Sequence, residues 1–369
     1  MTNTFWHGFA DMHLVKDAEV VIRSADGVWL ETVDGRRLLD ATAALWYCAV
    51  GYGRRSIADA VAGQLTTIAA YSSFGAYTTE TTLALADRLA AMAPIPDAKV
   101  FLGSGGSDAV DTAGKLVRRY WDVVGRPEKR IIVSREHGYH GMHAWGTSLA
   151  GIPGNKAGYN GAIIDEVIHV GIDDTESLGA LFEQQGGEIA AFIGEPVVGA
   201  GGVYPPHPSY WAEVQRLCRE HDVLLIADEV ITAFGRTGAL WGSQRYGIEP
   251  DLILFAKVVT SGYVPLGGVL VGPRVAAPFW EGSTAGPMFV HGYTYSGHAA
   301  ACAAAMANLD IIEGEGLVGR VAAMEAGFDA AVRRLEGAPL VGEVRRFAPL
   351  VALRCRAMLN QCGHTLPIY

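Results

Sequence analysis

The stretch from residue 223 to residue 268 constrains the fold of this chain more than any other. It contains two short aliphatic runs, at 223–227 and 252–256, and a charged residue follows each run directly: Asp228 and Lys257. Apolar runs of about five residues are typical of strands buried on both faces of a parallel sheet. The two charges therefore belong at the carboxyl ends of these strands, which is the edge where open α/β sheets bind ligands.

An acid and an amine at one edge of a sheet suit pyridoxal phosphate. The aldehyde of this cofactor forms a Schiff base with a lysine amine. A buried carboxylate keeps its pyridine nitrogen protonated, which lets the ring accept electrons. We therefore predict Lys257 as the Schiff-base lysine and Asp228 as the partner of the ring nitrogen. Either residue alone is better explained as a strand-end cap or a solvated amine, but the pair, with glycine-rich stretches around it, favours the cofactor.

Length, charge and cysteine pattern narrow the class of protein. A chain of 369 residues suggests two domains, and a net charge of −10 without a basic run argues against a nucleic-acid partner. The five cysteines are scattered, with no CxxC motif, so neither a zinc site nor a disulfide framework is predicted and a reducing cytoplasm fits. The N-terminus does not resemble a signal peptide, and the apolar runs are too short to span a membrane.

A glycine-rich loop suggests a phosphate site. Gly103, Gly105 and Gly106 precede Ser107 and Asp108, which are good helix starters, and a helix is expected to follow to about residue 121. Backbone N–H groups at such a helix start suit a phosphate. Taken by itself, the loop is explained equally well as a plain turn. A dinucleotide is less suitable because the GxGxxG pattern is not matched.

Three further side chains are candidates for contact with a cofactor. Tyr139, in a glycine-flanked loop, could stack on a flat ring, and the hydroxyl of Thr294 could donate to phosphate. Glu195 ends the apolar run at 189–194 and has two equally good interpretations, a cofactor contact or an ion pair with an arginine such as Arg236.

A metal site is not predicted. The histidines at 137, 140 and 143 lie close together in the sequence, but no cysteine or carboxylate follows in the spacing of a metal site.

Together, these segments resemble the class III aminotransferases, or omega-transaminases, which are pyridoxal-phosphate enzymes of fold type I. The resemblance runs from about Phe5 to about Arg345. It is carried by LLIADEVITAFGRTG around the aspartate, FAKVVTSGYVPLGG around the lysine, GGSDAVDTAGKL at the phosphate loop, and the shorter segments GYHG, GEPVVGAGG and GYTYSGH.

The resemblance implies roles for individual residues. Gly106 and Ser107 would bind the phosphate, and Val230 would pack on the ring face opposite Tyr139. Thr294 would reach the phosphate of the other subunit, which implies a homodimer with shared active sites. An aromatic lining of the substrate pocket, as in members that accept amines or β-alanine, is implied for Phe9, Trp46 and Tyr139.

The sequence departs from the family in three places. Val110 replaces the usual asparagine of the phosphate motif, and Gly8 stands where proline is usual. After Arg345 the chain ends on a segment unlike the family's small domain, which suggests a truncated or frame-shifted tail. The arginine that binds the substrate carboxylate in many members lies in that region, so no residue here is assigned this role.

The predicted fold is α/β. Residues 51–309 would form a large domain with a mostly parallel sheet of about seven strands flanked by helices, and residues 1–50 with 310–369 would form an incomplete small domain. The predicted reaction moves an amino group from an amine or omega-amino acid to a keto acid such as pyruvate, with Lys257 as the general base. Alternatives are decarboxylation, racemisation or aminomutase chemistry with the same cofactor, or an inactive remnant. The sequence does not identify the donor, the acceptor or the stereochemistry.

Overall fold

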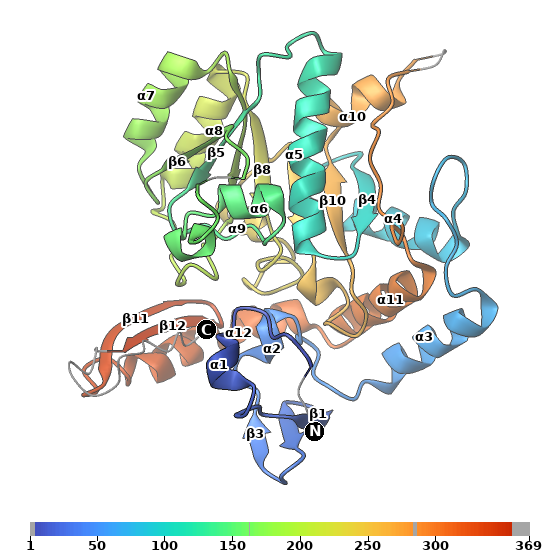
Figure 1. Ribbon diagram of the computed structural model, residues 1–369, viewed down its shortest axis with the longest axis vertical. Helices are drawn as coiled ribbons and strands as arrows, with labels where there is room; N and C mark the ends of the chain where they lie inside the picture. The colour runs from blue at the N-terminus through green and yellow to red at the C-terminus, as the bar shows by residue number, and fades with distance from the viewer. Residues whose placement is uncertain (1–3, 162, 283–285, 356–369) are drawn as a thin grey trace.

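The computed structural model describes residues 4–161, 163–282 and 286–355, and its centre is a seven-stranded sheet between two layers of helices (Figure 1). In spatial order the strands are β4 (Lys99–Gly103), β10 (Gly267–Val271), β9 (Leu252–Phe255), β8 (Leu224–Asp228), β7 (Ile189–Gly194), β5 (Ile131–Arg135) and β6 (Val167–Val170). The pairs β10–β4 and β10–β9 are antiparallel, and the pairs β9–β8, β8–β7, β7–β5 and β5–β6 are parallel. The predicted α/β fold with a mostly parallel sheet is therefore confirmed.

Helices cover both faces of the sheet because side chains alternate along each strand. On one face, Ile226 and Leu254 pack against α5, α6 and α10. On the other, Phe255 packs against α4 and α11, and Leu225 against α7 and α8. The bounds of these helices are α4 (Glu80–Met92), α5 (Gly106–Val123), α6 (Ala144–Leu149), α7 (Thr175–Gln185), α8 (Tyr210–Glu220), α10 (Pro273–Trp280) and α11 (Ala299–Gly314).

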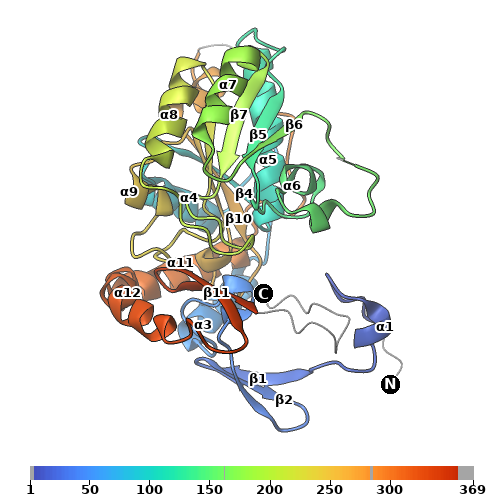
Figure 2. The same ribbon diagram turned by 90° about the vertical axis from the view of Figure 1, so that its left-hand side faces the viewer.

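The N-terminal residues form a separate small antiparallel sheet that lies below the main sheet in Figure 2. Its turns contain Gly27 and Gly35, both with positive φ (55° and 83°), a conformation that glycine adopts without strain. The hairpins predicted from the two Asp-Gly pairs are thus present. The elements of this part are α1 (Met12–Val15), β1 (Ile22–Asp26), β2 (Trp29–Thr32), β3 (Arg37–Leu39), α2 (Ala43–Trp46) and α3 (Arg55–Thr67).

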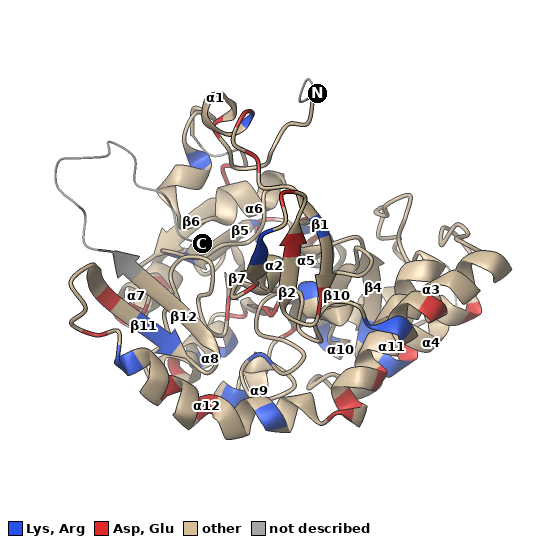
Figure 3. Cartoon of the chain, turned by 90° about the horizontal axis from the view of Figure 1, so that it is seen from below, with Lys and Arg blue, Asp and Glu red and all other residues tan. Residues whose placement is uncertain are grey.

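The C-terminal part consists of a helix and a hairpin, α12 (Leu317–Arg333), β11 (Val341–Phe347) and β12 (Leu350–Cys355). Along α12, two acidic residues, Glu325 and Asp329, lie between Arg320 and Arg333 (Figure 3). The predicted boundaries at residues 50 and 309 stay predictions, and the tail from residue 356 lies outside the described residues. None of the helices in the described part is long and apolar enough to cross a membrane.

Two local signals predicted helices well, apolar residues at helical spacing for 80–92 and a run of small residues for 299–312. Those expected at 80–92 and 299–312 appear as α4 and α11, with ends that agree within two residues. The edge strand β6 and helix α7 were not predicted. β6 has only four residues and includes His169, so its apolar pattern is too short to identify a strand.

Candidate active site

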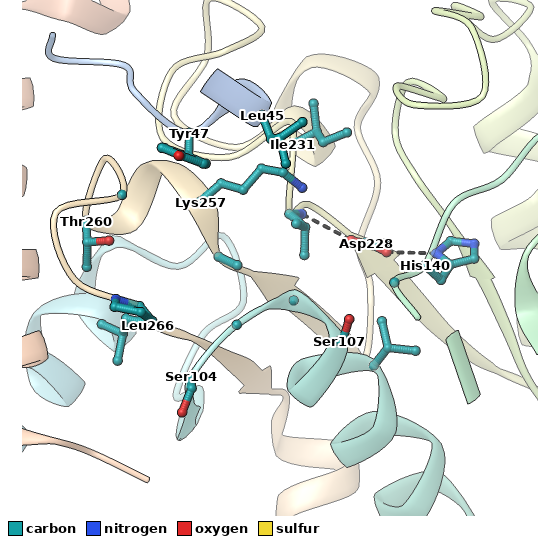
Figure 4. Close-up of a pocket in the computed structure, with 18 of the residues that line it drawn as sticks. Leu45, Tyr47, Ser104, Ser107, His140, Asp228, Ile231, Lys257, Thr260 and Leu266 are labelled. Atoms are coloured by element: carbon teal, nitrogen blue, oxygen red, sulfur yellow. Dashed lines mark hydrogen bonds and ion pairs between the residues drawn. The ribbon is translucent and has the colours of Figure 1, made fainter. Parts of the chain in front are cut away.

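A cavity of about 430 Å³ lies at the carboxyl ends of β8 and β9, beside the first turn of α5 (Figure 4). The register pairs Asp228 with Leu254, so Lys257, three residues further along the chain, reaches the same edge. Most of the residues singled out in the sequence line this one cavity: Gly106, Ser107, Tyr139, Glu195, Asp228, Val230 and Lys257.

Asp228 is the last residue of β8, and its buried carboxylate has a fixed orientation. One carboxylate oxygen, Oδ1, accepts from the backbone N–H of Val230 at 3.1 Å. The other, Oδ2, lies 2.7 Å from Nδ1 of His140, which is also buried. Because a carboxylate accepts, Nδ1 carries the proton and donates. The Nε2 atom of His140 has no hydrogen-bond partner among the described residues. The histidine therefore serves to hold the aspartate.

Lys257 is half-buried and presents its amine to the cavity, and Figure 4 shows its side chain extending into it. Burial lowers the pKa of Lys257, and the carboxylates of Asp228 and Glu195 oppose this shift. A lysine with a lowered pKa is unprotonated more often, which makes it a better nucleophile and proton acceptor. Its backbone has φ 50°, which is uncommon for a residue other than glycine. Such strain is typical of functional sites.

The first turn of α5 closes the opposite side of the cavity. The Oγ atom of Ser107 accepts from the N–H of Met142 at 3.1 Å, so its own hydroxyl hydrogen remains available to donate. A Cβ atom on Gly106 would lie 3.1 Å from the methyl groups of Val230, so glycine lets this turn approach Val230 closely. The N–H groups and positive dipole end of this long helix favour an anion here.

Glu195 positions the loop that carries Tyr139. Its Oε1 accepts from the N–H of Tyr139 at 3.0 Å, and its Oε2 accepts from the N–H of Gly199 at 2.9 Å. Burial raises the pKa of Glu195. In the described structure, the guanidinium of Arg236 donates to the carbonyl oxygen of Trp46 at 2.8 Å, so the alternative of an ion pair between Arg236 and Glu195 gains no support.

Comparison with known families identifies the fold and the chemistry. The sequence model of the aminotransferase class-III family matches residues 13–361. The chain belongs to the class III aminotransferases. The match continues past Arg345, where the motif resemblance was expected to end, and its last residues lie outside the described part of this aminotransferase.

Relatives and solved structures agree with this assignment. The chain is 38% identical to diaminobutyrate–2-oxoglutarate transaminase of Halomonas elongata, over 90% of this chain and 76% of the relative. It is 37% identical to putrescine–pyruvate aminotransferase of Pseudomonas aeruginosa, over 90% and 76% of the two chains. A PLP-bound amine transaminase from an uncultivated Pseudomonas species superimposes with a TM-score of 0.87, at 38% identity over 94% and 83% of the chains.

This aminotransferase is a pyridoxal-phosphate enzyme, and the cavity suits the cofactor. The amine of Lys257 and the buried carboxylate of Asp228 come from adjacent strand ends, and a helix N-terminus faces the same space. The close approach of Gly106 to Val230 leaves little room for a side chain there. A cavity of this volume lies within the usual range for cofactor sites. The residues present therefore fit the group.

Three predicted site residues do not line this cavity. Phe9 is 64% exposed, in the N-terminal segment, and Thr294 is exposed on the loop before α11. Trp46 packs in a small cluster that includes Ile231 and Leu350. Its neighbour Tyr47 lines the cavity instead.

His140 is the functional residue whose role the sequence did not indicate. It was considered only as a metal ligand, whereas the structure places it on Asp228. No group of three or more His, Cys, Asp or Glu residues able to hold a metal occurs within residues 4–161, 163–282 and 286–355. Its position directly after the predicted stacking residue Tyr139 was the one available signal.

Proposed function

We propose that this protein transfers an amino group from a primary amine or omega-amino acid to a keto acid such as pyruvate. The observation that carries the proposal is the convergence of Asp228 and Lys257 on one cavity from adjacent strand ends. The names of its relatives support the substrate class, since they include a diaminobutyrate–2-oxoglutarate transaminase and a putrescine–pyruvate aminotransferase.

When bound, pyridoxal phosphate supplies an aldehyde that takes up the amino group and a ring that accepts electrons from the adjacent carbon. The side chains of the protein hold the cofactor and move the proton. The amine of Lys257 holds the cofactor, then acts as the general base that moves a proton of the substrate. The carboxylate of Asp228, fixed by His140 and the Val230 N–H, holds the proton of the pyridine nitrogen.

The remaining residues orient the cofactor. Gly106 and Ser107 bind the phosphate at the start of α5, and Tyr139 and Val230 pack on the two faces of the ring. All four line the cavity, which supports these roles. Glu195 fixes the backbone at Tyr139 and so determines where that ring lies.

The protein acts as a homodimer in this proposal, with Thr294 donating to the phosphate of the neighbouring subunit. Two features support this arrangement. Thr294 is exposed and does not line the cavity of its own chain. Large apolar side chains around it are also exposed, among them Phe74 at 52%, Val290 at 79% and Tyr295 at 67%. An apolar surface of this kind is typical of a subunit interface.

The amine substrate would enter past aromatic side chains. Phe9 and Trp46 contribute to this entrance, and Trp46 is tied to the large domain by the hydrogen bond from Arg236. A cytoplasmic location stays a prediction from the scattered cysteines, of which Cys48, Cys218 and Cys302 are unpaired in the structure.

The proposal is tested with a panel of ¹⁵N-labelled amines and omega-amino acids, each incubated with pyruvate and the enzyme. We expect ¹⁵N-alanine together with the aldehyde or keto product of at least one donor, and no such product from the Lys257→Ala variant. Release of carbon dioxide, or racemised substrate, without ¹⁵N-alanine would instead support the alternative chemistries and reject amino transfer. The same incubation with labelled alanine as donor and 2-oxoglutarate in place of pyruvate tests whether the enzyme also transfers the amino group to 2-oxoglutarate.

A further inference from the structure

An extended segment, residues 288–293, contacts one face of α5, and we name it the α5 strap. Three contacts define its course. Arg119 Nε donates to the carbonyl oxygen of Met288 at 3.2 Å, Lys115 Nζ lies 3.0 Å from His291, and the hydroxyl of Tyr293 donates to the carbonyl oxygen of Asp108 at 3.0 Å. The strap therefore runs antiparallel to α5 and ends at its first turn.

His291 is the central contact of the strap. Lys115 has only donor hydrogens, so it donates to Nδ1 of the imidazole. The other nitrogen, Nε2, then carries the hydrogen and donates to the hydroxyl of Thr112 at 2.9 Å. Thr112 and Lys115 are three residues apart on α5 and so share one helix face. The imidazole thus bridges two side chains of this face in a single orientation.

Ring packing supports the same orientation. Phe289, His291 and Tyr293 alternate along the strap, and all three lie against Phe101 of β4. The imidazole is stacked on Phe101 with ring centroids 5.3 Å apart and an angle of 23°. The intervening residue Gly292 allows close contact on the other side, because a Cβ atom there would lie 2.3 Å from the ring of Phe74.

The strap ends where the proposed contact with the neighbouring subunit begins. Thr294 and Tyr295 follow Tyr293 directly and are exposed. The chain is tied down again at Ser296, whose Oγ accepts from the N–H of Tyr293 at 3.1 Å and whose carbonyl oxygen accepts from Ser73 Oγ at 2.8 Å. Thr294 is thus held on a short exposed turn between two anchored points.

We propose that His291 and Lys115 are positioning residues, which fix the α5 strap so that Thr294 is presented to the cofactor phosphate of the neighbouring subunit. This inference rests on the homodimer and the role of Thr294 in the proposed function. Neither residue lines the cavity of its own chain, so an effect of either on cofactor binding is indirect, and it is transmitted either through the strap to Thr294 or through α5 to the cavity of the same chain.

The test measures the dissociation constant of pyridoxal phosphate from the holoenzyme and the dimer fraction by sedimentation. His291→Phe keeps the ring packing and removes both hydrogen bonds, and Lys115→Met removes one of them. Each is expected to weaken cofactor binding about three- to tenfold, the usual effect of losing one or two hydrogen bonds. Lys99→Met, an equivalent change on β4, is the control and should leave binding unchanged.

Thr294→Ala and the double variant His291→Phe with Thr294→Ala decide the interpretation. If His291 acts through Thr294, the double variant binds the cofactor no more weakly than Thr294→Ala alone. If the losses of cofactor binding caused by the two single changes add up in the double variant, the proposal is overturned. A His291→Phe variant that binds the cofactor normally, or that becomes monomeric, overturns it as well. A Thr294→Ala variant with normal cofactor binding would reject the proposed role of Thr294 itself. Thermal unfolding of His291→Phe and Thr112→Val checks that a loss of binding does not come from misfolding.

Discussion

Asp228 and His140 form a buried pair, and their contact fixes the orientation of the Asp228 carboxylate in the site. The carboxylate has two donors, the imidazole of His140 and the backbone N–H of Val230, so its orientation is set before any cofactor binds. Residues that orient a functional group in this way typically change activity by a smaller factor than the group itself.

We therefore expect the two positions to differ in the size of their effects. Asp228→Asn cannot hold the proton of the ring nitrogen as a counter-ion, and kcat should fall by about a hundredfold or more. His140→Gln leaves the Val230 contact in place, and kcat should fall only about tenfold. Steady-state kinetics at saturating cofactor measure both. Equal kcat values for the two variants would contradict this ranking, and His207→Gln, at an exposed histidine, serves as the control.

Lys257 is expected to carry the proton transfer. Replacing it with alanine removes both the amine that holds the cofactor and the general base, so activity should fall by about a thousandfold or more. Small soluble amines such as methylamine should restore part of the rate, because they can take over the proton transfer. The measurement is the transfer rate with and without added amine, and an activity within tenfold of the unmodified enzyme would show that another base acts.

At the scale of single elements, helix α5 contacts two functional parts of the molecule, the cavity and the α5 strap. Its first turn approaches Val230 in the cavity, and its outer face holds the α5 strap. The apolar face of the helix packs on the sheet through Ala109, Ala113 and Val117, so the position of both contacts follows from the position of the sheet. A shift of α5 would therefore move the proposed phosphate site and the strap together.

The strap also predicts a dependence of stability on pH. Burial, together with the nearby Lys115 and opposed by Asp108, lowers the pKa of His291 to about 4. An unfolded histidine titrates near 6.5, so the neutral imidazole stabilises the fold above that pH, and this contribution is lost as pH falls toward 4. Unfolding midpoints of the native protein should drop more steeply over this range than those of His291→Phe. Parallel curves for the two proteins would show that His291 does not contribute.

On the scale of the whole molecule, the proposed dimer predicts complementation between inactive subunits. Lys257→Ala removes the amine of its own site, and Thr294→Glu places a carboxylate against the phosphate of the neighbouring site. A heterodimer of the two has one site with both changes and one site with neither. Random mixing should therefore restore about a quarter of the normal activity.

The complementation is measured after the two inactive proteins are unfolded and refolded together. Each variant refolded alone is the control. Activity no higher than in these controls would show that Thr294 does not act across the subunit boundary, and would also remove the basis of the proposed role of the strap.

The sequence alone determined the sheet, the cofactor and the residues delivered by strand ends. Buried parallel strands are continuous apolar runs, so the charges that end them, Asp228 and Lys257, were visible without a structure. A different local signal, a glycine-rich loop followed by good helix starters, marked Gly106 and Ser107 at the start of α5. The short edge strand β6 was missed because its apolar run is too brief to distinguish a strand from a loop.

Only the tertiary structure decided which distant side chains meet. His140 and Asp228 are 88 residues apart, and Thr112 and His291 are 179 apart, so no spacing in the sequence relates them. The two donors to the buried carboxylate of Glu195, the backbone N–H groups of Tyr139 and Gly199, likewise come from separate loops that no sequence spacing relates to it. The apolar pattern of a segment indicates which of its own side chains are buried. Which segments contact one another depends on how the sheet brings them together.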